Sequence, residues 1–234
     1  MLKFREVFPN THVVLPVIHV KNMEQAAENI SIAQETGADG AFIIAHGSMA
    51  AINLIKIHQE LCIHFPDFWI GANFLDLMLH EVFDMIPPEM PGVWVDNASL
   101  DNNDLSSAMI AQHIKELQME KKWKGLYFGG FAFKYQRQPE NLIKSAILAT
   151  EFVDVITTSG PGTGQAASVE KIATIRSAVG DYFPIAIASG ITPANVKDYM
   201  PHANCFLVAT GINKEGDFYN LDPKKTKDLI DQVR

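Results

Sequence analysis

The stretch DVITTSGPGTGQAASVEKIATIRSAV, residues 154–179, contains one complete strand–loop–helix unit. It begins with a short β-branched run, Asp154–Thr158, which is typical of a parallel strand buried on both faces. A glycine-rich loop follows, and Ser168 stands where a helix N-cap is expected, with Glu170 in the first turn. Beyond it, apolar side chains recur at helical spacing. The stretch therefore predicts a β-strand, a flexible connection and an amphipathic helix.

The same unit repeats on both sides of this stretch. Seven further apolar runs are each too short for a helix, and each is followed by a longer amphipathic segment or a glycine-rich loop: Val13–Val20, Gly40–His46, Phe68–Phe74, Gly92–Asp96, Gly125–Phe133, Pro184–Ser189 and Cys205–Ala209. Eight units in 234 residues give about 29 residues each, which is the length of one βα unit. We therefore predict a single (β/α)8 barrel domain over residues 1–234, with a doubly wound open sheet as the alternative.

Three helical segments have recognisable apolar faces or capping residues. Glu24–Glu35 has a stripe of Ala and Ile residues and stops before Gly37, a usual C-terminal residue. Thr192 followed by Pro193 has the pattern of an N-cap and first helical residue. We expect the apolar stripes to be buried, including the one formed by Met109, Ile110, His113, Ile114 and Leu117.

Composition and charge exclude several classes of protein. The chain is 47% hydrophobic, has a mean hydropathy of +0.04 and carries a net charge of −8, which disfavours nucleic acid or an anionic membrane as the main partner. No apolar run approaches the roughly 18 residues of a membrane span, and the first ten residues lack a signal-peptide core. Cys62 and Cys205 lack metal or redox spacing, so we expect free thiols. These features predict a soluble, cytoplasmic protein without membrane insertion.

In a parallel barrel the active site lies at the C-terminal ends of the strands. Each predicted strand ends in polar residues or glycine: His19, His46, Asn73 with Asp76, Asp96 with Asn97, Lys134, Thr158 with Ser159, Ser189 with Gly190, and Thr210 with Gly211. Polar ends on all eight strands predict one site at that end of the barrel.

The last three units predict a phosphate site. Glycines directly after strands seven and eight allow backbone N–H groups to approach an anion, and barrels often bind phosphate there. The alternative is that these glycines only make tight turns. The glycine-rich loop from Gly160 to Gly164 is either a lid over a ligand or a plain flexible loop. The predicted phosphate or ligand contacts are Thr158, Ser159, Gly160, Gly162, Ser189, Gly190, Thr192, Thr210 and Gly211.

Lysine and carboxylate residues supply candidate catalytic groups. Lys134 follows a very apolar strand, so it is a candidate base or Schiff-base amine, a cation that holds an anion, or a surface lysine. Asp96, Asn97 and Asp76 suit general acid–base chemistry or binding of a diol. Asp76 is also a candidate N-cap, so Asp96 ranks above it.

Two histidines, His19 and His46, end neighbouring strands. They suit acid–base chemistry or, together with Asp96, a metal site, but no established metal-ligand spacing is present, and we predict no metal and no cofactor. The other histidines fall near helices and are assigned to packing or surface. Asp39 and Asp154 precede strands, at the end of a barrel that serves stability, and are excluded as catalytic residues.

These motifs resemble the BtpA family. The resemblance rests on Asp154–Gly164, on Pro184–Val196 with its Ser189-Gly190-Ile191-Thr192 sequence, on Leu207–Ile212, on Gly37–Gly40 and on Lys134. It spans most of the chain and is specific from about Asp154 onward. The family is named for a role in photosystem I assembly or stability and includes members of unassigned activity. The resemblance implies a ribulose-phosphate-binding type of barrel.

The departures from the family fall in the first half of the site. The family has an acidic residue and asparagine where this chain has Ala45-His46-Gly47, an Arg-Asn-Asp type of ending where it has Phe74-Leu75-Asp76, and histidine where it has Tyr135. These departures prevent transfer of any chemistry from the family. The phosphate site and the polar strand ends make the leading hypothesis an enzyme of aldolase, isomerase or lyase type that acts on a small phosphorylated metabolite, with Lys134 and Asp96 in proton transfer or carbonyl activation. The alternatives are a phosphoribosyltransferase, which would need Mg²⁺, and a non-catalytic assembly factor. The sequence is also compatible with a homo-oligomer.

Overall fold

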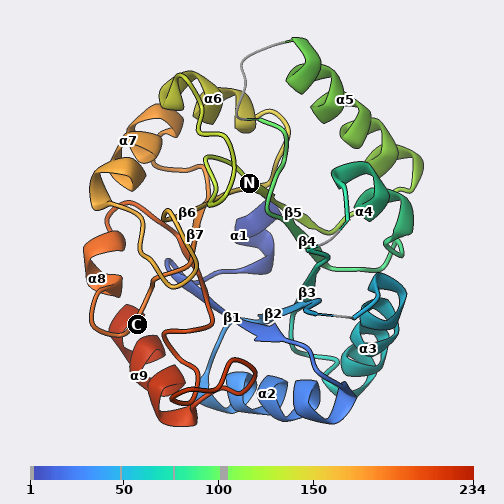
Figure 1. Ribbon diagram of the computed structural model, residues 1–234, viewed down its shortest axis with the longest axis vertical. Coiled ribbons are helices and arrows are strands. Elements are labelled where there is room, and N and C mark those ends of the chain that lie inside the picture. Colours follow the sequence, from blue (N-terminus) through green and yellow to red (C-terminus); the bar gives the residue numbers. More distant parts are fainter. Residues whose placement is uncertain (1–2, 48, 76, 101–104) are drawn as a thin grey trace.

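Eight parallel strands close into a barrel in the computed structural model, which describes residues 3–47, 49–75, 77–100 and 105–234 (Figure 1). The strands pair in chain order, and β8 returns to β1 with Cys205 opposite Val13. Their bounds are β1 Val13–His19, β2 Ala41–Ile44, β3 Ile70–Asn73, β4 Gly92–Val95, β5 Leu126–Gly130, β6 Val155–Ser159, β7 Ile185–Ala188 and β8 Cys205–Val208. The predicted (β/α)8 barrel is confirmed, and the hydrogen bonding of β1 to β8 excludes the open sheet.

Helices α2 to α9 each follow one strand and form a ring outside the barrel (Figure 1). The bounds are α1 Lys3–Val7, α2 Met23–Thr36, α3 Ala51–His64, α4 Leu79–Met85, α5 Leu105–Glu120, α6 Leu142–Ala149, α7 Val169–Val179, α8 Val196–Tyr199 and α9 Pro223–Val233. Within the described ranges, no helix combines the length and apolar composition that a bilayer span requires. Cys62 and Cys205 are both free thiols.

The short helix α1 lies inside the ring of helices and fills the N-terminal end of the barrel (Figure 1). Phe4 and Phe8 are almost completely buried there, with ring centroids 6.3 Å from Phe128 and 5.1 Å from Trp69, respectively. Burial of these aromatic rings removes a large apolar surface from water and stabilises this end of the barrel. The barrel is therefore closed at this end, and its strand ends are accessible from the other.

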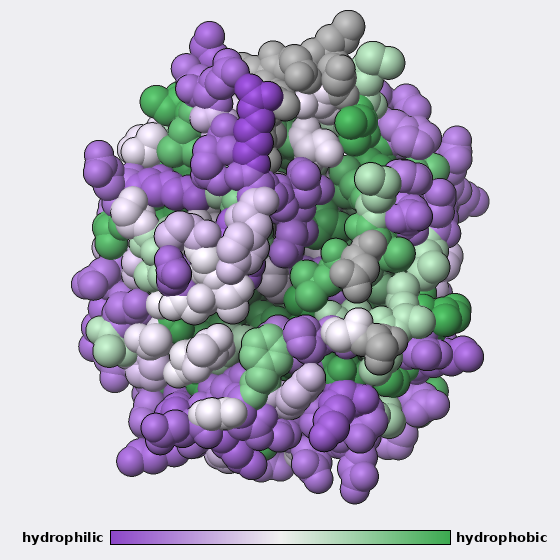
Figure 2. Space-filling model, viewed as in Figure 1, coloured by the Kyte–Doolittle hydropathy of each residue, from purple (hydrophilic) through white to green (hydrophobic). Residues whose placement is uncertain are grey.

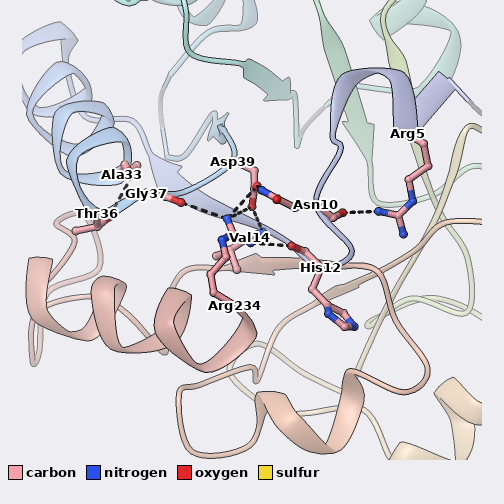
Figure 3. A network of polar contacts seen from close by, with 9 residues as sticks. All are labelled: Arg5, Asn10, His12, Val14, Ala33, Thr36, Gly37, Asp39 and Arg234. Atoms are coloured by element: carbon pink, nitrogen blue, oxygen red, sulfur yellow. Dashed lines mark hydrogen bonds and ion pairs between the residues drawn. The ribbon is translucent and has the colours of Figure 1, made fainter.

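A polar network around Asp39 ties the N-terminal end together (Figure 3). The Asp39 carboxylate accepts hydrogen bonds from the Val14 backbone N–H at 2.8 Å, the Asn10 amide at 2.6 Å and the Arg234 guanidinium at 3.0 Å. It therefore joins β1, the start of β2 and the C-terminus of the chain. Asp39 lies far from the strand ends, as expected from its position before a strand.

The helix faces follow the predicted stripes except on α5 and at Val169, the first residue of α7, which is 37% exposed. In α2, Ala26, Ile30 and Ala33 are fully buried. In α5 the prediction is wrong for Met109 and Ile110, which are 63% and 43% exposed, and for His113, which is also exposed. Ile114 is buried as predicted, together with Ala111, because the face turned to the barrel is rotated away from Met109 and Ile110.

The predicted N-cap at Thr192 is also wrong. Helix α8 has four residues, and its N-cap position is Asn195. The Asn195 side chain accepts a hydrogen bond from the Thr192 backbone N–H at 2.8 Å and donates one to the Gly190 carbonyl at 2.8 Å. The asparagine thus stabilises a turn between Gly190 and Asn195, so the chain enters the helix three residues later than the Thr192-Pro193 pattern predicts.

Candidate functional site

The C-terminal ends of the strands surround a cavity of about 290 Å³. Its walls come from nearly every unit of the barrel, as the sequence predicts for a site at this end. Eight of the predicted site residues line it: His19, His46, Asp96, Lys134, Ser189, Gly190, Thr210 and Gly211.

Lys134 follows β5 and lies between the loops after β6 and β7. Its backbone N–H donates to the Ser159 hydroxyl at 2.8 Å, and its side-chain amine donates to the Ser189 hydroxyl at 3.1 Å. The amine is also 5.7 Å from the centre of the Phe133 ring. These contacts direct a half-buried positive charge toward the β7 side of the cavity.

Asp96 follows β4, and one of its carboxylate oxygens accepts a hydrogen bond from the Asn73 amide at 3.0 Å. Burial raises the pKa of Asp96 above its ordinary value, while the Asn73 hydrogen bond and the Lys134 charge oppose the rise. Gln136 donates to the Asp96 backbone carbonyl at 2.9 Å, which fixes the strand end. A carboxyl group with a raised pKa in a cavity is suited to exchange protons with a ligand.

His19 and His46 lie together beneath an aromatic side chain. Their ring centroids are 5.6 Å apart, and Phe218 from the β8–α9 loop lies 4.0 Å from the first and 4.8 Å from the second. Burial, followed by the charges of His46 and Lys134, lowers the pKa of His19 from 6.5 to about 4. His19 is therefore a neutral imidazole at pH 7, able to donate and accept hydrogen bonds.

The loops after β7 and β8 touch through their backbones. A Cβ atom added to Gly211 would lie 2.1 Å from the Ile191 carbonyl oxygen, and one added to Gly190 would lie 2.1 Å from the Ala166 nitrogen. Both distances are far below van der Waals contact, so only glycine allows this approach. In both glycines, the position that a Cβ atom would occupy is therefore filled by a neighbouring loop. The sequence did not predict this packing role.

Several hydrogen-bonding groups around the cavity lack a protein partner. In the described ranges, the backbone N–H groups of Gly190, Ile191 and Gly211 donate to no protein atom, and neither His19 Nδ1 nor Trp94 Nε1 is bonded. All five residues line the cavity. The His19 and Trp94 nitrogens are buried, and buried polar groups normally have partners. Gly190 and Gly211 are partly exposed, so their N–H groups are open to the cavity and available to a ligand.

Other predicted donors are already used by the protein. The Thr192 N–H donates to Asn195. The N–H groups of Ile212 and Asn213 both donate to the Ala209 carbonyl, at 2.9 and 3.1 Å. The predicted anion site is therefore reduced to the donors of Gly190, Ile191 and Gly211.

The remaining predicted site residues do not line this cavity. Thr158 and Ser159 are fully buried, and Thr158 donates to the Ala132 carbonyl at 3.3 Å. Gly160 belongs to a neighbouring hollow, and Asn97 to a second cavity described below. Gly162 and Thr192 line neither the cavity nor the hollow, and Asp76 lies outside the described residues.

The backbone itself is strained at the strand ends. Ala132, Tyr135 and Ser189 have φ angles of +47°, +60° and +78°, and none of them is glycine. Such conformations cost roughly 1–3 kcal/mol each and gather at functional sites. Ala132 and Tyr135 follow β5 on either side of Lys134, and Ser189 follows β7.

Sequence reasoning missed three side chains that shape this end of the barrel: Tyr135, Gln136 and Phe218. Asn73 was named from its position at the end of a predicted strand, and the structure adds its hydrogen bond to Asp96. Tyr135 accepts a hydrogen bond from the Thr163 N–H at 3.1 Å and so ties the β6–α7 loop to β5. Phe218 was not predictable from the sequence around it, because the sequence of a long loop does not show which way an aromatic side chain points.

The described residues contain no group of three or more His, Cys, Asp or Glu side chains arranged to hold a metal ion. The pair of carboxylates that Mg²⁺ would require consists of Asp96 and Asp76, and Asp76 is outside the described ranges.

The fold and the position of the cavity define the class of protein: a (β/α)8 barrel with its site at the C-terminal strand ends. Residues 133–234 match the model of the BtpA family, and the resemblance is confirmed over this part of the chain. The match includes Lys134 and the loops after β6, β7 and β8. No curated protein sequence matches the chain.

Solved structures of three enzymes share the barrel. Tryptophan synthase from Mycobacterium tuberculosis aligns with a TM-score of 0.68 and 10% identity over 99% of this chain and 96% of that one. (S)-3-O-geranylgeranylglyceryl phosphate synthase from Thermoplasma acidophilum, in complex with sn-glycerol-1-phosphate, gives 0.67 and 14% over 99% and 96%. Thiamine phosphate pyrophosphorylase from Pyrococcus furiosus gives 0.63 and 15% over 96% of each chain. At these identities the likeness establishes the fold.

Proposed function

We propose that this protein is an enzyme that binds a small phosphorylated metabolite in the C-terminal cavity and transfers protons on it. The observation that carries the proposal is the cluster of unpartnered donors from Gly190, Ile191 and Gly211 beside the Lys134 amine. Several N–H donors and one cation around a cavity complement the charge of a phosphate. Two of the three similar enzymes carry a phosphate compound in their names, which supports the same class of ligand.

The chemistry follows from the groups that face the phosphate site. Lys134 is placed to stabilise negative charge on a carbonyl or hydroxyl oxygen of the ligand. Its amine is held at the cavity by the 3.1 Å hydrogen bond to the Ser189 hydroxyl. Asp96, with its raised pKa, serves as the proton donor or acceptor. Neutral His19 offers a hydrogen bond to a further ligand oxygen. This arrangement fits an aldolase, isomerase or lyase type of reaction.

The cavity also weighs against a purely structural role. A barrel used only as a scaffold has no need for an open space lined by unpartnered polar atoms, and burying such atoms costs stability. The phosphoribosyltransferase alternative has no observation in its favour among the described residues.

Binding of phosphorylated ligands tests the proposal directly. Unfolding of the wild type would be followed in the presence of sugar phosphates, triose phosphates and phosphoribosyl diphosphate. A ligand at 100 times its Kd adds about 2.7 kcal/mol to stability. We expect Lys134→Met to abolish most of that gain. Lys144→Met removes the same charge from an exposed position on α6 and is the matched control. Equal binding by the Lys134→Met and Lys144→Met variants would contradict the proposal.

A further inference from the structure

A second cavity of about 590 Å³ lies between α4 and α5, beside the candidate site. Leu75 and Asp96 line both cavities, so these two side chains form the boundary between them. The Asp96 carboxylate accepts a hydrogen bond from Asn73 of the second cavity and is influenced by the charge of Lys134 in the first. Leu75 is an apolar side chain that is 41% exposed. The two cavities therefore adjoin at Leu75 and Asp96.

The second cavity has apolar walls from α4, α5 and the β3–α4 loop, and polar side chains lie among them: Asn73, His80, Asn97, Ser99, His113 and Gln136. Apart from Asp96 at its edge, no Asp, Glu, Lys or Arg side chain lines it within the described ranges. Met78 and Met109 are 67% and 63% exposed, and Ile110 is 43% exposed. In Figure 2, hydrophobic surface gathers on the side of the molecule where Figure 1 places α4 and α5. Exposed apolar side chains concentrated in one hollow indicate a binding surface, and methionine adapts readily to different ligand shapes.

We propose that the substrate is amphiphilic: its phosphate head binds at the strand ends near Lys134, and an apolar tail lies in the α4–α5 cavity. This proposal rests on the proposed function, because the head group is the phosphorylated part of the same ligand. It explains why the α5 face with Met109 and Ile110 is not packed against the barrel. The tail would cover these residues and remove their apolar surface from water.

A homologous series of n-alkyl phosphates, from methyl to octyl phosphate, tests the proposal by calorimetric titration. Each methylene group transferred from water to an apolar cavity contributes enough to tighten binding by about fourfold. We therefore expect Kd to fall steadily with chain length in the wild type. Met109→Gln should flatten this dependence and leave methyl phosphate binding unchanged. Met119→Gln makes the same substitution on α5, at a residue that is 72% exposed and outside the cavity, and should retain the full dependence.

The outcomes separate the two proposals. If methyl phosphate binds but Kd does not change with chain length, the amphiphilic substrate is wrong while the phosphate site stands, and the apolar cavity is left to another partner such as a protein segment. If the dependence survives both Met109→Gln and Ile110→Ser, the tail lies elsewhere and the inference is overturned. If no member of the series binds, the proposed function fails and this inference fails with it.

Discussion

The side-chain amine of Lys134 donates a 3.1 Å hydrogen bond to the hydroxyl of Ser189, a residue held at a φ angle of +78°. The bond joins the end of β5 to the end of β7 across the wall of the cavity. A non-glycine residue with positive φ costs roughly 1–2 kcal/mol, so the fold tolerates strain in order to place this hydroxyl beside the amine.

The strain gives a prediction about Ser189→Gly. Glycine relieves the backbone strain, and we expect the free energy of unfolding to rise by about 1 kcal/mol. The same change removes the hydroxyl and should weaken binding of a phosphorylated ligand by about fivefold to tenfold, the worth of one hydrogen bond. Denaturant unfolding and calorimetric titration measure the two effects separately.

Lys122→Gly is the control for this experiment. Lys122 has a φ angle of +52° in the loop before β5, at the opposite end of the barrel. It should gain stability without any change in ligand affinity. If Ser189→Gly likewise gains stability and keeps full affinity, Ser189 has no part in the site.

Asp96→Asn should stabilise the protein at pH 7 and abolish turnover. Burial raises the pKa of Asp96 in the folded state, so its contribution to stability is present below the pKa of the unfolded chain and is lost as pH rises through the folded pKa. Asparagine keeps an oxygen that accepts from Asn73 and removes this charge. Chemical unfolding at pH 7 and pH 4 measures the effect, which should be smaller at pH 4. If Asp96→Asn is instead less stable than the wild type at pH 7, burial of the Asp96 carboxylate does not destabilise the folded protein.

His19 gives stability the opposite dependence on pH. Its folded pKa of about 4 lies below the unfolded value of 6.5, so its contribution is complete above pH 6.5 and is lost as pH falls toward 4. A difference of this size corresponds to about 3 kcal/mol. His19→Gln should therefore flatten the loss of stability between pH 6.5 and 4. His64→Gln changes an exposed histidine on α3 and should leave the slope as in the wild type; equal slopes in all three proteins would contradict the assignment.

Two glycines with the same backbone angle test the contact between loops. Gly190 and Gly164 both have a φ angle of +73°, but a Cβ atom at Gly190 would lie 2.1 Å from the Ala166 nitrogen, while nothing lies within 4 Å of one at Gly164. We expect Gly190→Ala to cost about 1–3 kcal/mol more than Gly164→Ala, because the loops must move apart. Thermal unfolding measures the difference, and equal losses would show that the contact between the loops is not tight.

The repeated apolar runs made the barrel predictable from sequence, because each strand is buried on both faces and each helix on one. The strand-end rule then placed His19, Asp96, Lys134 and Ser189 around one cavity without knowledge of their distances. It failed for Thr192, whose backbone N–H is not available to a ligand because it donates to the side chain of Asn195. It also failed for Met109, because helical spacing alone does not say which of two adjacent faces packs against the barrel.

The glycines show a further limit of sequence reasoning. Gly190 and Gly211 were correctly placed in the loops at the strand ends, yet their missing side chains face neighbouring loops, an arrangement that depends on contacts across the barrel. Phe218 reaches His19 from a position 199 residues later in the chain. Contacts of this range appear only when the barrel closes.

Amide NMR can detect whether the backbone donors after β7 and β8 bind a phosphate. The ¹⁵N-labelled protein would be titrated with inorganic phosphate and then with ribose 5-phosphate. We predict saturable shifts of the amide signals of Gly190, Ile191 and Gly211, with Gly180 and Gly216, which lie outside the cavity, unmoved. Shifts confined to other loops, or none at these three amides at saturating ligand, would contradict the claim.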